Sequence, residues 1–76
     1  MDAQSMAYLT SGLGAGLVTF GAAYGISKIT STAVESIARQ PEAANDIRLT
    51  ALIMSALIEG VALFSAVTAF VLATGE

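Results

Sequence analysis

Residues 51–72 read ALIMSALIEGVALFSAVTAFVL, and Glu59 is the one charged side chain among them. No other charge occurs between residues 49 and 75, and these 27 residues would span ~40 Å as a helix that rises ~1.5 Å per residue. That length is enough to cross a bilayer core of about 30 Å. A carboxylate near the bilayer centre is costly, so an acidic residue there is by default a functional-site hypothesis.

The composition is that of a membrane protein. Of the 76 residues, 55% are hydrophobic and only 12% are charged, about half the charged fraction of an ordinary soluble domain. The chain has no Cys and no His, which excludes disulfides and the usual zinc sites as a source of stability. We therefore expect lipid and neighbouring protein chains to cover its apolar surface.

Several other function classes are disfavoured. The formal net charge of −3 and the lack of a basic cluster argue against nucleic acid as a partner. No GxxxxGK[ST] phosphate loop is present either, so we expect no catalytic residues for nucleotide chemistry in this chain. Residues 12–16 read GLGAG, but the dinucleotide fingerprint needs a third glycine where Leu17 stands.

A second uncharged run precedes the polar centre of the chain. It extends from residue 3 to residue 27, between Asp2 and Lys28, and its 25 positions are enough for one membrane span. The N-terminus lacks the positive region of a secretory signal, so we interpret this run as mature structure. Because helices and closed barrels alone satisfy their backbone in lipid, the two runs predict an all-α membrane protein with two transmembrane helices.

The break between the helices falls at Arg39, Gln40 and Pro41. Proline disfavours helical geometry at the residue before it and suits the first position of a following helix. Lys28 can extend its ammonium to the headgroups, which allows the first helix to continue beyond the membrane. We expect one hairpin over residues 1–76, with helix 1 at about 4–39, a polar loop at about 39–42 and helix 2 at about 42–75.

The cations predict the orientation of the hairpin. Lys28, Arg39 and Arg48 all lie in or beside the loop, and the terminal segments carry none. By the positive-inside rule, the loop is cytoplasmic and both termini lie on the outer side of the membrane.

Small residues mark the packing surface of helix 1. Residues with helical spacing form one stripe of Gly12, Gly16, Thr19, Ala23 and Ser27, and we expect a second stripe of Gly14, Gly21 and Gly25 beside it. Small residues let transmembrane backbones approach closely. Two adjacent stripes would make one broad, nearly flat face, which suits a helix with two neighbours in the wall of a homo-oligomeric ring. A dimer seam with excess glycine is the alternative.

Glu59 lies on a small-residue stripe of helix 2, together with Ser55, Ala62, Ala66, Ala69 and Ala73. Ser55, one turn away, could form a hydrogen bond with the carboxyl. The candidate neighbours of this site are Ser55, Gly25, Ile26, Val61 and Phe64.

Three interpretations of Glu59 compete. A salt bridge needs a cation at the same depth, but a hairpin that pivots near Gln40 and Pro41 leaves Lys28 ~6 residues, or ~9 Å, closer to the loop. The second is a glutamate that stays protonated and bonds a neighbouring helix. The third is a reversible ion site, in which the carboxyl crosses lipid in its neutral form and loses its ion where water or a partner's cation stabilises the anion.

Residues 33–43 read AVESIARQPEA, with an acid twenty positions after Arg39 and a glycine-rich helix before them. This combination, which covers nearly the whole chain, resembles the c-subunit of the F-type ATP synthase. The resemblance implies a ring of identical hairpins in the inner membrane of a bacterium, with Glu59 as the ion carrier. It implies that the loop at Arg39, Gln40 and Pro41 docks on the central stalk, and that an arginine of the stator's a-subunit stabilises the ionised form of Glu59 as it passes.

The resemblance also indicates the ion. Sodium-carrying relatives supply oxygen ligands from a polar side chain on helix 1 and from a hydroxyl just after the acid. The corresponding places here look like Ile26, Gly60 and Val61, none of which carries a side-chain oxygen. We therefore expect that the transported ion is a proton and not sodium. We expect no cofactor and no bound metal. This sequence departs from the family in one respect, because Thr19, Ala23 and Ser27 interrupt the alternating glycine pattern of the first helix. A structural oligomerising hairpin and the proteolipid of a vacuolar-type proton pump are the alternative functions.

Overall fold

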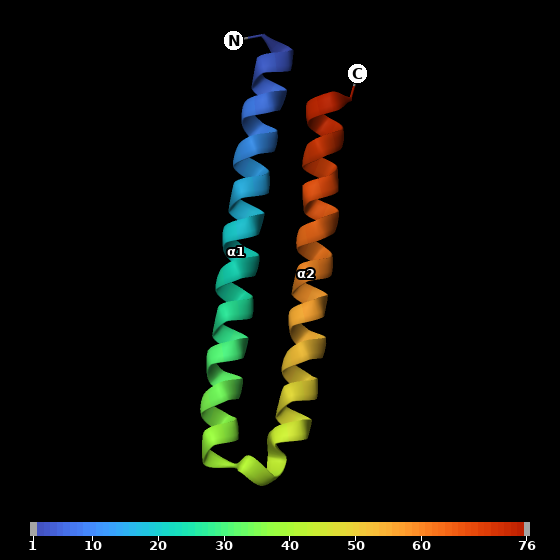
Figure 1. Cartoon of the computed structure of the whole chain (residues 1–76). Helices are drawn as coiled ribbons and strands as arrows, with labels where there is room; N and C mark the ends of the chain where they lie inside the picture. Colours follow the sequence, from blue (N-terminus) through green and yellow to red (C-terminus); the bar gives the residue numbers. More distant parts are fainter. Residues whose placement is uncertain (1, 76) are drawn as a thin grey trace.

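The computed structural model describes residues 2–75 and forms a hairpin of two long helices (Figure 1). Helix α1 spans Ala3–Arg39, a short 3₁₀ turn η1 spans Pro41–Ala43, and helix α2 spans Ala44–Thr74. The helices run antiparallel and side by side, and the Cα atoms extend over 58 × 16 × 7 Å. The prediction of a two-helix hairpin is therefore confirmed.

Local interactions define both ends of α1. Asp2 is its N-cap, with an extended backbone, and its carboxylate accepts a 2.7 Å hydrogen bond from the backbone N–H of Ser5. This bond lowers the pKa of Asp2 below its ordinary value. The hydrogen bond stabilises the ionised carboxylate of Asp2. Its contribution to the stability of the helix is therefore fully present above the ordinary pKa of an aspartate and is lost as the pH falls through the lowered pKa of Asp2. At the other end, the N–H of Gln40 donates to the carbonyl of Ser36 and Pro41 starts the turn.

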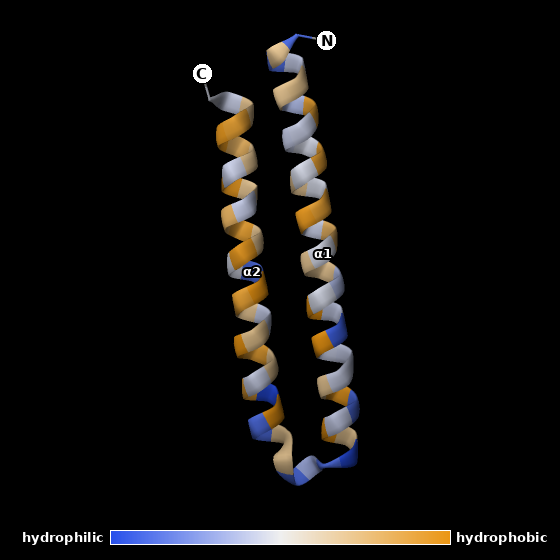
Figure 2. Ribbon diagram, turned by 180° about the vertical axis from the view of Figure 1, so that it is seen from behind, coloured by the Kyte–Doolittle hydropathy of each residue, from blue (hydrophilic) through white to orange (hydrophobic). Residues whose placement is uncertain are grey.

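Over residues 2–75 the hairpin has no hydrophobic core of its own. Among these residues, only Ser11 is buried, and large side chains such as Phe20 and Phe64 are 73% and 78% exposed. Apolar residues cover both helices, and hydrophilic ones gather toward the loop (Figure 2). Both helices are long and apolar enough to cross a membrane. Surface of this kind must be covered by lipid or by other protein chains.

Small side chains bring the two helices together. The half-buried positions recur every three or four residues and are mostly Ala, Gly or Ser, as in Ala22, Ala62 and Ala69. A Cβ atom added to Gly25 would lie 3.3 Å from the Cδ1 atom of Ile58, so Gly25 and Ile58 face each other across the interface. This pair defines the register of the hairpin.

Replacing Gly25 with leucine should push the helices of a single hairpin apart, because the new side chain overlaps Ile58; overpacking of this kind costs about 1–3 kcal/mol. The measurement is the distance between spin labels at introduced cysteines in place of the exposed Leu17 and Leu63, in detergent that keeps the chain monomeric. The control is Gly21→Leu, since no atom of α2 lies within 4 Å of a Cβ added there. An equal separation in both variants would contradict the proposed close contact.

Candidate functional site

The groove between the helices opens on two opposite sides. On one side it is lined by Glu59, Thr19 and Ser27 among others, and we call this side the Glu59 face. On the other side it is lined by Lys28 near the loop and by Gly21 and Val61 farther from it, and we call this side the Lys28 face. The two sides therefore carry different chemistry.

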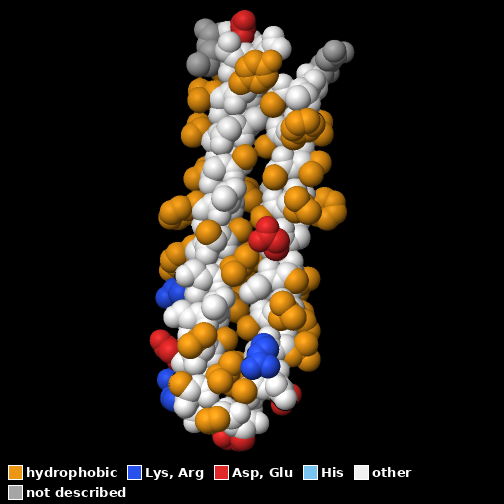
Figure 3. All heavy atoms as spheres, in the orientation of Figure 1, with side chains coloured by type: hydrophobic (Ala, Val, Ile, Leu, Met, Phe, Trp, Pro, Cys, Tyr) orange, Lys and Arg blue, Asp and Glu red, His pale blue; other side chains and the backbone are white. Residues whose placement is uncertain are grey.

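The carboxyl of Glu59 lies at the middle of the hairpin's length. Glu59 is exposed and lines a groove of about 440 Å³ whose other walls are largely small or aliphatic: Thr19, Ala22, Ala23, Ile26, Ser27, Ala62, Leu63 and Ala66. The space-filling view shows an acidic side chain at mid-height between hydrophobic ones, with basic side chains lying toward the loop end (Figure 3). Small neighbours leave the carboxyl open to close approach from the side of the hairpin.

The hydroxyl groups of Thr19 and Ser27 lie in the same groove as Glu59. In the sequence, these two residues were noted only as members of a small-residue stripe. Thr19 donates its hydroxyl hydrogen to the carbonyl of Ala15 at 2.8 Å, which leaves its oxygen able to accept. Because Gly25 faces Ile58, Glu59 lies near the depth of residue 24, so Ser27 is about 4–5 Å and Thr19 about 7–8 Å away along the axis. The spacing of Thr19, Ala23 and Ser27 along one stripe was visible in the sequence, but the register that brings it to Glu59 was not.

The structure brings Glu59 together with only some of its expected neighbours. Ile26 lines the same groove. Gly25 faces Ile58 of its own chain, and Ser55 is half-buried one turn closer to the loop. Val61 lines the groove of the Lys28 face. Phe64 is 78% exposed and lines neither groove.

The expectation of one broad small-residue face on α1 is wrong. Gly12, Thr19, Ala23 and Ser27 line the Glu59 face, whereas Gly14 and Gly21 line the Lys28 face. The reason is the helical period: a step of two residues turns a side chain by about 200°, so alternating glycines point to opposite sides. Helix α1 thus presents two small-residue surfaces, one on each side of the hairpin.

Lys28 lies nearer to the depth of Glu59 than the sequence suggested. Since Gly25 faces Ile58, the axial offset between Lys28 and Glu59 is ~4 residues, or ~6 Å, instead of ~9 Å. The difference arises because η1 shifts the pivot of the hairpin toward α2. The two residues nevertheless line opposite faces, and the Lys28 Nζ atom lies 5.9 Å from the centroid of the Tyr24 ring. Lys28 and Glu59 of one hairpin are therefore not directed at each other.

Comparison with known proteins identifies the family. The family model for the ATP synthase c-subunit matches residues 9–72. The chain belongs to this family. It is 56% identical over 59 residues to the ATP synthase c-subunit of Bacteroides thetaiotaomicron, an alignment that covers 78% of this chain and 69% of the relative. It is 51% identical to that of Phocaeicola vulgatus, covering 83% and 75% of the two chains, and 42% identical to that of Latilactobacillus sakei, covering 88% and 96%.

The family membership confirms the resemblance seen in the sequence. No solved structure matches the chain. Membership in the family together with two apolar helices makes this chain a membrane-integral subunit of an ATP synthase.

Proposed function

We propose that the chain is the proton-carrying rotor subunit of an F-type ATP synthase, in which reversible protonation of Glu59 couples proton flow to ring rotation and ATP synthesis. The observation that carries this proposal is the position of Glu59. It is the one acid in the apolar part of α2, and it lines a groove of small residues at mid-height on one side of the hairpin. An ionisable group at such a depth marks an ion pathway in membrane proteins.

A ring follows from the two unlike faces. Each lone hairpin leaves many large hydrophobic side chains exposed, so it needs neighbours. Contacts between the Glu59 face of one copy and the Lys28 face of the next are head-to-tail contacts, and such contacts close into a ring when the rotation between copies allows it. The glycines on both sides of α1 let neighbouring backbones approach closely.

In this ring the proton site is completed by the next copy. Val61 and Leu57 line the Lys28 face, so they would cover the Glu59 carboxyl of a neighbour. Thr19, Ile26 and Ser27 of its own chain would form the other wall. The neutral carboxyl would then travel through the lipid shielded on both sides, with the Ser27 hydroxyl or a backbone carbonyl as its hydrogen-bond partner.

Two further partners are proposed, one at Glu59 and one at the loop of the hairpin. Among residues 2–75, no cation of the same hairpin is directed at the carboxyl, so an arginine of the stator's a-subunit would stabilise the anion. Arg39, Gln40 and Pro41 are exposed at the tip of the hairpin, where the central stalk would dock. The cations near the loop favour a cytoplasmic loop in a bacterial inner membrane.

A ring of single carboxyls also suits the energetics. One proton that crosses 100 mV yields only ~2.3 kcal/mol, which is less than the synthesis of one ATP requires in a cell. Several protons must therefore be added together before one product is released. A ring in which each copy carries one Glu59 performs that addition by rotating one copy at a time.

The groove favours a proton over sodium. A hard cation needs several oxygen ligands, and besides Glu59 the described residues of the groove offer only the hydroxyls of Thr19 and Ser27 on side chains. These residues are eight positions apart, or ~12 Å along the axis, so one ion cannot contact both. A proton needs only the carboxyl and one acceptor.

Replacing Glu59 with glutamine should abolish proton-coupled ATP synthesis and leave the ring intact, because the amide keeps the shape of the carboxyl but cannot release a proton. ATP synthesis in energised membrane vesicles and the mass of the detergent-resistant oligomer are the two measurements. The control is Glu35→Gln, an exposed acid near the loop, which should synthesise ATP at the normal rate. ATP synthesis by the Glu59→Gln variant would refute the proposal. If the unmodified chain forms an intact ring that carries no protons, a structural hairpin is favoured instead.

Labelling with a carboxyl-reactive carbodiimide should identify the ion. The reagent attacks the protonated carboxyl, so raising the pH should protect Glu59, whereas millimolar sodium should not. Mass spectrometry of the labelled chain locates the modified residue among its six acids. Protection by sodium at constant pH would mean that the site binds sodium and that the ion assignment is wrong.

Gly21→Leu should prevent ring assembly while leaving the single hairpin unchanged. A Cβ at residue 21 meets nothing within 4 Å among the described residues of its own chain, and the residue lines the Lys28 face, where a neighbour would pack. The yield of detergent-resistant oligomer relative to the unmodified chain measures the effect. Leu17→Ile serves as the control, since Leu17 is 72% exposed and lines neither groove. Rings of normal yield from the Gly21 variant would rule out close packing on this face.

A further inference from the structure

Near the loop end of α2, the acidic Asp46 and the basic Arg48 are close in sequence but lie on opposite sides of the helix. Asp46 lines the groove of the Lys28 face. Arg48 follows two positions later, which turns it by about 200°, and it precedes Glu59 by eleven positions, or about three full turns. Arg48 therefore lies on the Glu59 side of the helix.

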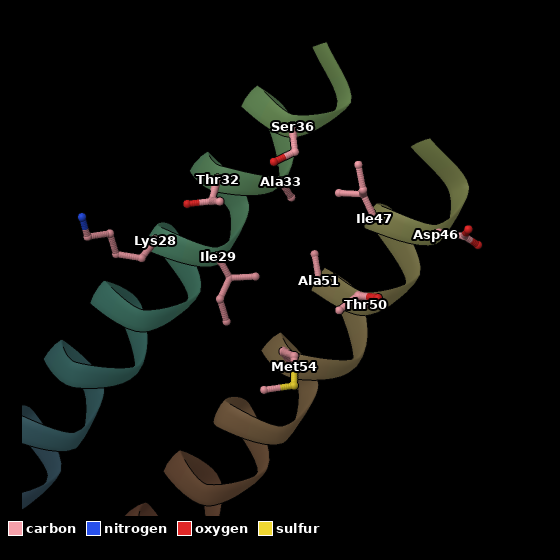
Figure 4. A pocket seen from close by; sticks show the side chains of 10 residues that line it. All are labelled: Lys28, Ile29, Thr32, Ala33, Ser36, Asp46, Ile47, Thr50, Ala51 and Met54. Atoms are coloured by element: carbon pink, nitrogen blue, oxygen red, sulfur yellow. The ribbon is translucent and has the colours of Figure 1, made fainter. Parts of the chain in front are cut away.

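Both side chains are free to reach outward. Asp46 and Arg48 are exposed. Figure 4 shows Lys28 and Asp46 at the two outer edges of the groove, each directed away from the apolar residues between them. The Arg48 Nη1 atom donates a long hydrogen bond of 3.4 Å to the Oδ1 atom of Asn45, which leaves most of the guanidinium donors unused.

We propose that Asp46 of one hairpin pairs with Arg48 of the next hairpin in an intermolecular salt bridge that sets the height of adjacent copies. This inference rests on the ring proposed above. When the Glu59 face of one copy packs on the Lys28 face of another at equal height, the two charges differ by two residues, or ~3 Å, along the axis. That offset is within the reach of an arginine side chain, and the charges are complementary.

The pair supplies what the rest of the interface lacks. Apart from Glu59, the residues that line the two grooves at mid-height are uncharged, so they contain no charge pair that would specify the vertical register. A charged pair penalises a slip of one helical turn that carries Arg48 away from Asp46, because the axial offset between the two charges would grow from ~3 Å to ~8 Å. In a closed ring, a slip in the opposite direction at one interface must be compensated by this penalised slip at another. Equal heights bring every Glu59 to the same depth, as a single stator arginine would require.

Cysteine cross-linking tests the geometry, because the chain contains no cysteine of its own. A ring that carries both Asp46→Cys and Arg48→Cys should form a ladder of covalent oligomers under mild oxidation, analysed in denaturing gels after isolation from membranes with the complete enzyme. Positions 46 and 48 point to opposite sides of one helix, so they cannot join within a chain. Each single variant should give no ladder.

The matched control pairs Asp46→Cys with Leu52→Cys. Residue 52 lies one turn after Arg48 on the same side of α2, about 6 Å farther from the loop. A ladder from the 46/48 pair and none from the 46/52 pair supports the proposed register. A ladder only from the 46/52 pair overturns it. If neither pair joins while rings are intact, the Cα atoms lie beyond the ~7 Å reach of a disulfide, and the charge exchange below decides. If the unmodified chain forms no oligomer, the proposed function itself fails.

A charge exchange tests the attraction. Asp46→Arg and Arg48→Asp should each reduce the yield of detergent-resistant ring, because each places like charges opposite one another. The double exchange restores an attractive pair and should recover the yield. Unchanged yield in both single variants overturns the proposal. So does a double variant that loses the ring as fully as the single variants do, because an attractive pair between neighbours would then have no effect on the yield.

Discussion

A carboxyl that faces no cation among the described residues of its own hairpin is the constraint on which the rest of the structure depends. Glu59 lies at mid-height in a groove whose walls offer two hydroxyls and otherwise mainly aliphatic or small side chains. In such surroundings the charged form is disfavoured unless a partner or water stabilises it. The hairpin alone leaves the carboxyl exposed, so both its cover and its counter-charge must come from other chains.

The helical period explains how one short chain meets both demands. On α2 the step from Glu59 to Val61 turns the side chain to the other face. The proposed ion carrier and the residue that would cover it in a neighbouring copy are therefore nearly adjacent in sequence. On α1 the same step distributes the glycines over two faces. The same step separates Asp46 from Arg48. In the proposed ring, each face of the hairpin would therefore be completed by the opposite face of a neighbouring copy.

The sequence was sufficient for the hairpin, for the break near Pro41 and for the family, because each depends on long uncharged runs or on a local motif. It was insufficient for the arrangement of the glycines: the two stripes predict one broad face, whereas a spacing of two residues places side chains on opposite sides of a helix. It also missed the approach of Ser27 to Glu59. That approach depends on the register between helices, which the contact of Gly25 with Ile58 and the extra turn at η1 determine.

The sideways direction of Glu59 has a mechanical consequence. If the carboxyl lay on the line between the two helices, its own chain would bury it and no partner could discharge it. If it pointed straight away from α1, lipid would face it at every step. On the lateral face, beside Thr19 and Ser27, it would be covered by the next copy of the proposed ring. In the proposed ring, a neighbour that shields the carboxyl in lipid would have to leave it reachable at the stator. Rotation of the ring, and not a movement within the hairpin, would then change the environment of the proton.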